Sequence, residues 1–125
     1  MKSIQGDMIE LIRKEQFDVF LHSCNCFNTM GAGLAKSIRV NFPEVYTADL
    51  ITKMGDINKL GTINPVELCD YDAIHKCMEK IKVQYSGKRI CFPKIGSGLG
   101  GGNWDVIKEI INNDLHGEDI TLIVL

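Results

Sequence analysis

The polar run that follows residue 21 carries the side chains best suited to chemistry. His22 is the histidine nearest to either glycine-rich turn, and an imidazole there can act as a general acid or base near neutral pH. A structural histidine bonded within a sheet explains the same residue equally well. Asn25 and Asn28 carry amides that can donate to and accept from ribose hydroxyls, although each taken singly is explained more simply by an Asx turn.

Two glycine-rich turns form the second candidate feature, and each lies between an apolar run and a predicted helix. The first is Gly31-Ala32-Gly33, and the second, residues 96–102, has five glycines in seven residues. Glycine at a helix start lets the backbone approach an anion, and the free N–H groups of the first helical turn then point at it. A plain connector is the alternative, but a shorter loop would serve that purpose. Two such junctions predict a ligand with more than one phosphate, although neither fits a Walker A or Rossmann fingerprint.

The apolar pattern predicts the elements that position these turns. Strands are expected over residues 3–5, 17–21, 60–68, 88–95 and 120–125, and helices over residues 8–14, 34–42, 44–53, 71–85 and 104–115. Strands and helices therefore alternate, which is typical of an α/β fold with helices on both faces of a largely parallel sheet. Ligands bind such sheets at the carboxyl ends of the strands, and both glycine turns follow a strand at that end.

Length and composition fit one globular domain over residues 1–125. The chain has a mass of 14.0 kDa, a hydrophobic fraction of 45% and a charged fraction of 24%. Its net charge of −2, with acids and bases interspersed, argues against a nucleic-acid surface. No apolar run approaches the ~20 residues of a membrane helix, and residues 1–7 lack the apolar core of a signal peptide. We therefore expect a cytoplasmic monomer without membrane or nucleic-acid partners.

The cysteines are odd in number and show no paired metal-ligand spacing. No secretion signal accompanies them, so reduced thiols are predicted. A structural zinc held by His22 and the two cysteines that follow it is the alternative, because residues two apart share a face of an extended segment. The absence of Cys-x-x-Cys and His-x-x-x-His pairs disfavours it, so we expect no metal and no cofactor. The five cysteines are Cys24, Cys26, Cys69, Cys77 and Cys91.

Motifs spread over nearly the whole chain resemble one known family. The matching segments are Gly6-Asp7, the run from His22 to Cys26, residues 30–35, and residues 93–99 with Trp104. In order and spacing they resemble a macro domain, and in particular the small macro proteins of the ADP-ribose-1''-phosphate phosphatase type, including phage-encoded forms. The resemblance implies an ADP-ribose cleft over a mixed sheet in a three-layer α/β/α fold.

The resemblance also assigns roles to single residues. Asp7 matches the acid that accepts from the adenine amino group, with Met8 beside it. His22 matches the histidine held to be catalytic and Asn25 matches the asparagine beside the distal ribose, so these two are the expected catalytic residues. Asn28 is a weaker match for ligand binding. The two phosphate loops match Gly31, Ala32, Gly33 and Leu34 for the first, and Ile95, Gly96, Ser97, Gly98, Leu99 and Gly100 for the second.

The chain departs from the family pattern at two places. Relatives that remove ADP-ribose from protein carboxylates carry an aspartate after the Gly-x-Gly-Leu of the second loop, where this chain has Gly100. Roughly two dozen residues with a further strand are also missing between residue 68 and the helix that starts at Tyr71, where the two elements nearly abut. Either the chain is a shortened member, or a stretch is absent from the sequence. In the first case the sheet lacks one inner strand.

The sequence therefore predicts hydrolysis of ADP-ribose 1''-phosphate to ADP-ribose and phosphate. His22 would activate water or protonate the leaving oxygen, and backbone N–H groups of the two turns would stabilise charge. The expected partner is accordingly ADP-ribose or its 1''-phosphate. One alternative is a module that binds ADP-ribose without turnover. Another is removal of ADP-ribose from proteins, which Gly100 disfavours.

Overall fold

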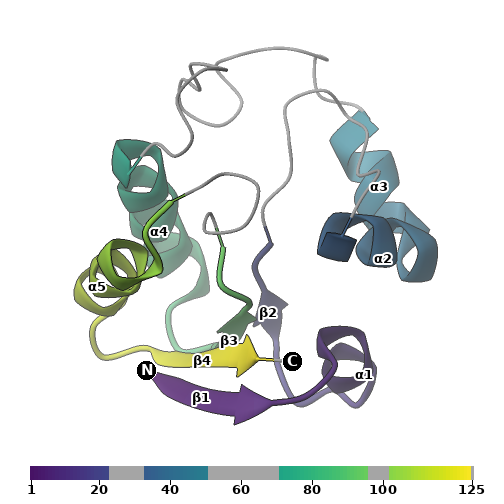
Figure 1. Ribbon diagram of the computed structural model, residues 1–125, viewed down its shortest axis with the longest axis horizontal. Coiled ribbons are helices and arrows are strands. Elements are labelled where there is room, and N and C mark those ends of the chain that lie inside the picture. The colour runs from purple at the N-terminus through teal and green to yellow at the C-terminus, as the bar shows by residue number, and fades with distance from the viewer. Residues whose placement is uncertain (23–32, 51–70, 96–101, 125) are drawn as a thin grey trace.

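Strands and helices alternate along the chain, as the apolar pattern predicts. The computed structural model describes residues 1–22, 33–50, 71–95 and 102–124. In chain order (Figure 1) the elements are β1 (Lys2–Gln5), α1 (Met8–Arg13), β2 (Val19–Phe20), α2 (Gly33–Asn41), α3 (Pro43–Leu50), α4 (Tyr71–Tyr85), β3 (Arg89–Phe92), α5 (Trp104–Asp114) and β4 (Asp119–Val124). The strand expected over residues 60–68 lies outside the described residues.

The strands form one sheet in the order β1-β4-β3-β2. Each described neighbour pair is parallel, with Ile4 opposite Ile123 and Cys91 opposite Thr121. The central strands β3 and β4 are buried over most of their length, which explains their nearly continuous apolar sequences. Within the described ranges the sheet is therefore purely parallel, and the mixed sheet that the resemblance implies stays a prediction for the rest of the chain.

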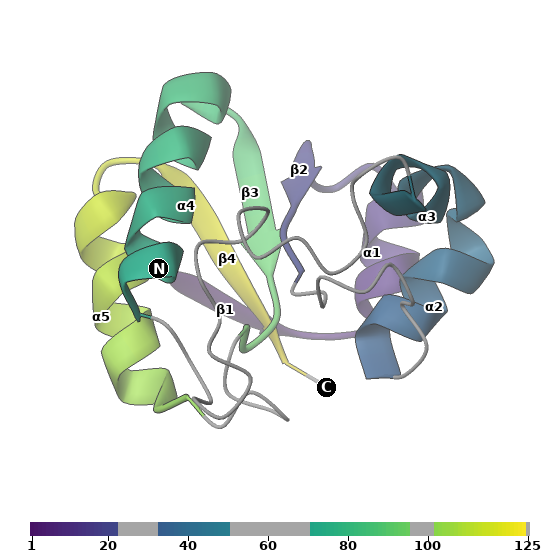
Figure 2. The same ribbon diagram turned by 90° about the horizontal axis from the view of Figure 1, so that it is seen from above.

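Helices cover both faces of this sheet. Because side chains alternate across a strand, Ile90 and Phe92 of β3 point to one face and Cys91 points to the other. Ile90 and Phe92 pack in one core cluster with Ile107 of α5 and with α4, whereas Cys91 packs with Met8 of α1. Figure 2 shows α4 and α5 on one side of the strands and α1, α2 and α3 on the other. The predicted three-layer α/β/α architecture is confirmed.

The helices begin and end at the residues that favour these positions. Asp7 caps α1 and Asn103 caps α5, each accepting a hydrogen bond from a backbone N–H of the first turn, and Pro43 opens α3. Gly87 and Gly117 follow α4 and α5 at φ angles of 83° and 84°, a region that glycine adopts without steric cost. No helix in the described part of the chain is both long and apolar enough to span a membrane.

Two strands are shorter than predicted. The sequence predicts strands over 17–21 and 88–95, but β2 is Val19–Phe20 and β3 is Arg89–Phe92. Pro93 has no N–H to give to a ladder, and the Ile95 N–H instead donates to the Pro93 carbonyl at 2.7 Å. The chain therefore turns out of the sheet at Pro93. One further backbone hydrogen bond lies beyond each end of β2. The Asp18 N–H donates to the Arg89 carbonyl and the Leu21 N–H donates to the Cys91 carbonyl, each at 2.8 Å.

Candidate functional site

The carboxyl edge of the sheet brings together the residues that lead into both glycine turns. In a parallel sheet all carboxyl ends lie at one edge. Asp7 follows β1, His22 follows β2 and Ile95 follows β3 at that edge. Since β2 and β3 are hydrogen-bonded neighbours, the segments that lead toward the two glycine turns leave adjacent strands (Figure 1). The meeting of the two turns at this edge stays a prediction, because most of their residues lie outside the described residues.

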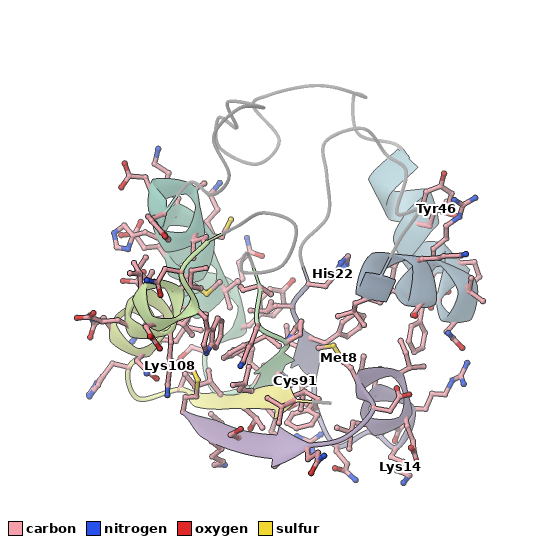
Figure 3. All side chains as sticks on the ribbon, viewed as in Figure 1. Met8, Lys14, His22, Tyr46, Cys91 and Lys108 are labelled. Carbon is pink, nitrogen blue, oxygen red and sulfur yellow. The ribbon has the colours of Figure 1, made fainter. Side chains whose placement is uncertain are left out.

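His22 lies at the carboxyl end of β2, and its ring contacts an aromatic neighbour. Its imidazole stacks on the ring of Phe20, with ring centroids 6.2 Å apart and an interplanar angle of 23°. Both residues are half-buried. In Figure 3 the His22 side chain points from the end of β2 toward α2, the helix that begins at Gly33 after the first glycine turn. A side chain in this place can meet both solvent and a molecule bound at the carboxyl edge.

Asp7 caps helix α1 with one of its two carboxylate oxygens. Oδ1 accepts from the Ile9 N–H at 2.9 Å and from the Glu10 N–H at 3.3 Å. The preceding Gly6 N–H donates to the Val124 carbonyl at 2.8 Å, which joins this turn to β4. Among the described residues no donor bonds to Oδ2, and the side chain is exposed. Asp7 is thus the N-cap of α1, and one carboxylate oxygen remains able to accept from a ligand.

Met8 and Leu34 place their side chains in the apolar interior. Met8 is 5% exposed and packs with Cys91 and Ile123. Leu34, in the first turn of α2, is half-buried and packs against the same cluster and against Ile38. Their expected contact with a ligand stays a prediction, and for Met8 only the backbone groups remain to make it.

The residues on both sides of the second glycine turn are held by contacts on the side of the sheet that carries α4 and α5. Ile95 packs against that core cluster at the start of the turn. At the other end the Asn103 N–H donates to the Tyr71 hydroxyl at 3.1 Å, and Asn103 Oδ1 accepts from the Asp105 N–H at 2.9 Å. Tyr71 thus ties the start of α5 to the start of α4, a role that no sequence spacing indicates.

Several predicted site residues lie outside the described residues, and their roles stay predictions. The same holds for Cys24 and Cys26, which belong to the zinc alternative, and for Cys69. The site residues concerned are Asn25, Asn28, Gly31, Ala32, Gly96, Ser97, Gly98, Leu99 and Gly100. Gly33 is described as the first residue of α2.

The two described cysteines are free thiols, as predicted for them. Cys77 is exposed on α4, and Cys91 is buried in the centre of the sheet. Burial raises the pKa of the Cys91 thiol to about 12, because a thiolate there would be removed from water. Cys91 is therefore protonated at neutral pH and unsuited to be a nucleophile, although its strand leads to the site.

Comparison with known proteins gives two sequence relatives, while no protein-family model matches the chain. An uncharacterized 17.5 kDa protein in the tk-vs intergenic region of Enterobacteria phage T4 is 30% identical over 151 residues, covering 100% of this chain and 95% of the phage protein. Because 151 aligned positions exceed the 125 residues of this chain, the alignment leaves gaps in it. An ADP-ribose 1''-phosphate phosphatase of Scheffersomyces stipitis is 38% identical over 48 residues, 37% of this chain and 28% of that protein.

Solved structures with the same fold extend this comparison. The macrodomain of Thermus aquaticus DarG superposes with a TM-score of 0.71 at 17% identity, covering 99% of this chain and 97% of that one. Thermosipho africanus DarTG in complex with ADP-ribose gives a TM-score of 0.72 at 16% identity, covering 100% of this chain and 42% of that one. At these identities the likeness shows a shared fold.

Proposed function

We propose that this chain, which shares the fold of solved macrodomains, is a macro domain that binds an ADP-ribose-type ligand along the carboxyl edge of its sheet. The observation that carries the proposal is the parallel pairing of β2 with β3, which brings His22 and Ile95, the residue before the second glycine turn, to one edge. The complex of Thermosipho africanus DarTG with ADP-ribose supports this ligand class, since that protein contains the same fold.

The distance between the two ends of the site favours a long ligand. Asp7 follows β1 and His22 follows β2, the outer strands in the described order β1-β4-β3-β2. Three strand spacings separate them, or about 14 Å. A nucleotide diphosphate with a second sugar can span that distance, with its adenine amino group donating to Asp7 Oδ2 and its diphosphate at the glycine turns. The distal ribose then lies near His22.

For the reaction, we propose hydrolysis of the phosphate ester of ADP-ribose 1''-phosphate. Water attacks phosphorus, the bond between phosphorus and the sugar oxygen breaks, and inorganic phosphate and ADP-ribose leave. His22 takes the proton from the attacking water or gives one to the leaving oxygen, with Asn25 orienting the distal ribose. Backbone N–H groups of the turns stabilise the charge on phosphorus-bound oxygens. The partial likeness to an ADP-ribose 1''-phosphate phosphatase supports this substrate.

Phosphate release by the purified chain tests the reaction. We expect the parent to release inorganic phosphate from ADP-ribose 1''-phosphate, and His22→Ala to be slower by about 100-fold or more, as for loss of a general acid or base. His116→Ala is the matched control, because His116 is exposed just after α5 and its backbone carbonyl, which the substitution keeps, accepts from Lys82 Nζ at 2.8 Å. This control should match the parent.

Binding and turnover are measured separately. If ADP-ribose binds by calorimetry but the parent releases no phosphate, the chain is a binding module and the proposed reaction is wrong. If His22→Ala turns over like the parent, His22 is not the acid or base. If ADP-ribose gives neither heat nor a thermal shift, the proposed ligand class itself is wrong.

A further inference from the structure

The His22 ring makes a stacking contact that the sequence pattern does not predict. Phe20 and His22 are two apart at the end of a strand, so their side chains point to the same face of the sheet. Their rings stack at a centroid distance of 6.2 Å and an angle of 23°. Offset stacking at this separation is a favourable aromatic geometry. The contact fixes the plane of the imidazole relative to the strand.

Phe20 in turn packs against other apolar side chains. Its ring lies 6.1 Å from the ring of Phe42 at an angle of 37°, and it packs against the buried side chains of Ile9 in α1 and Ile38 in α2. The guanidinium carbon of Arg13 lies 5.8 Å from the Phe42 ring centroid, a cation–π distance. These contacts form a continuous row from α1 through the end of α2 to the end of β2.

The row ties the imidazole to the helix that follows the first glycine turn. Arg13 Nη2 donates to Asn41 Oδ1 at 2.8 Å, so the outer end of the row is fixed to the last residue of α2. At its inner end, Phe20 and Leu34 in the first turn of α2 pack against the same buried pair, Ile9 and Ile38. Phe20 thus connects the imidazole to the core beneath α2.

We propose that Phe20 is a positioning residue for His22, which it orients toward a bound ligand by ring stacking. The proposal rests on the proposed function, because His22 is there the group that moves a proton. A general acid or base must lie within hydrogen-bond reach of its proton, and a shift of about 1 Å can cost a factor of 100 in rate. Phe20 touches neither substrate nor reacting atoms in this account and acts only through the imidazole.

The main variant is Phe20→Leu, which keeps an apolar side chain in the core and removes the stacking ring. We expect kcat to fall by about tenfold or more while KM and the Kd for ADP-ribose stay close to the parent's, since only proton transfer is disturbed. Phe20→Tyr keeps the ring and should recover most of the lost kcat. If Phe20→Leu retains the parent's kcat, or if Phe20→Tyr is as slow as Phe20→Leu, the positioning role is wrong.

Val19→Ala is the matched control for lost packing on the same strand. Val19 is half-buried on the opposite face, where it packs with the cluster of α4 and α5. It should lower the melting temperature and leave kcat unchanged. An equal loss of kcat in Val19→Ala would mean that general weakening of the strand explains the effect, which would overturn the proposal.

Two further measurements keep the proposal open to refutation. If Phe20→Leu does not fold, Phe42→Leu is used instead, because it removes the ring that contacts Phe20. It should lower kcat by a smaller factor. An unchanged kcat would contradict the role of these ring contacts in positioning His22. If the parent has no turnover, the proposed reaction is wrong. NMR then tests the stacking of Phe20 on His22 without a rate measurement. The ring-proton signals of His22 must then move between parent and Phe20→Leu, and unmoved signals would show that Phe20 does not hold the ring.

Discussion

The two edges of the sheet are built differently. At the amino edge, side chains bind the neighbouring turn and one another. Both Asp18 oxygens pair with Arg89, at 2.8 Å to Nη2 and 3.0 Å to Nε, and the Arg89 N–H adds a third bond at 2.8 Å. Glu118 accepts from the Ser86 hydroxyl at 2.6 Å and from the Gly87 N–H at 2.9 Å. These bonds close the turns that enter β3 and β4.

The described residues of the carboxyl edge make contacts of another kind. Asp7 caps α1 through one oxygen, and His22 is oriented by an aromatic ring. In the sequence, a glycine-rich turn follows β2 and another follows β3. From this difference we infer that the amino edge acts on stability, whereas the proposed ligand would bind at the carboxyl edge. Substitutions at the two edges should therefore separate stability from ligand binding.

Valine at a glycine of each edge should give the largest contrast. Gly98→Val, in the second glycine turn, should weaken ADP-ribose binding tenfold or more, about 1.4 kcal/mol, because a side chain there crowds the phosphate. Gly87→Val, at the amino edge, places a branched side chain at a φ of 83°. It should lower the free energy of unfolding by at least about 1 kcal/mol and leave the affinity of the folded protein unchanged. Calorimetry and thermal melts check both. If Gly98→Val folds and binds like the parent, the turn is a connector.

The two functions of Asp7 can be separated by a pair of substitutions. Asp7→Ala removes the cap and the ligand acceptor, so it should lower stability by about 1 kcal/mol and weaken binding by about 1–3 kcal/mol. Asp7→Asn keeps a capping oxygen but replaces the second one with an NH₂ group, which cannot accept from the adenine amino group. It should therefore melt near the parent and bind as weakly as Asp7→Ala. Parent-like binding by Asp7→Asn would contradict the adenine contact.

The Asp18–Arg89 pair should act only on stability, and only above acidic pH. The hydrogen bonds from Arg89 hold the pKa of the Asp18 carboxyl well below its usual range. A depressed pKa stabilises the fold above the unfolded-state value of about 3.9 and loses that contribution as the pH falls. The melting temperature of Asp18→Asn should thus lie below the parent's at neutral pH, with the gap closing below about pH 4. ADP-ribose affinity at neutral pH should not change.

A smaller and opposite pH effect is expected between α4 and α5. His75 Nδ1 lies 2.5 Å from Asp114 Oδ2, and Nε2 lies 3.2 Å from Glu79 Oε1. The bond to Asp114, aided by the charges of Glu79 and Asp72, raises the pKa of His75. A raised pKa stabilises the fold below the unfolded-state value of about 6.5, and the contribution is lost as the pH rises through the native value. The melting-temperature gap between parent and His75→Gln should therefore narrow at alkaline pH, and a constant gap would contradict the ion pair.

The sequence predicts local features of this fold better than contacts through space. Helix α4 is observed at Tyr71–Tyr85 as its apolar stripe predicts, and Asp7 and Asn103 cap helices as their residue types indicate. The strand before the second turn was predicted too long, because its apolar residues continue past Pro93 although its ladder does not.

Contacts between distant elements could not be predicted in the same way. Tyr71 and Asn103 are 32 positions apart, and neither residue type indicates the other. The stack of Phe20 on His22 is close in sequence, but it depends on both residues facing α2 rather than α4, which strand periodicity alone leaves open. The site is therefore predictable as a set of strand ends and turns, while the orientation of its side chains requires the packed structure.

An NMR titration with ADP-ribose tests most directly whether the ligand binds at the carboxyl edge. We expect the amide signals to shift at five residues of the carboxyl edge, namely Gly6, Asp7, His22, Leu34 and Ile95. Signals at the amino edge, including those of Asp18, Arg89 and Glu118, should stay in place. Shifts centred on the amino edge, or no shifts at saturating ligand, would contradict the proposal that this chain binds ADP-ribose where its parallel strands end.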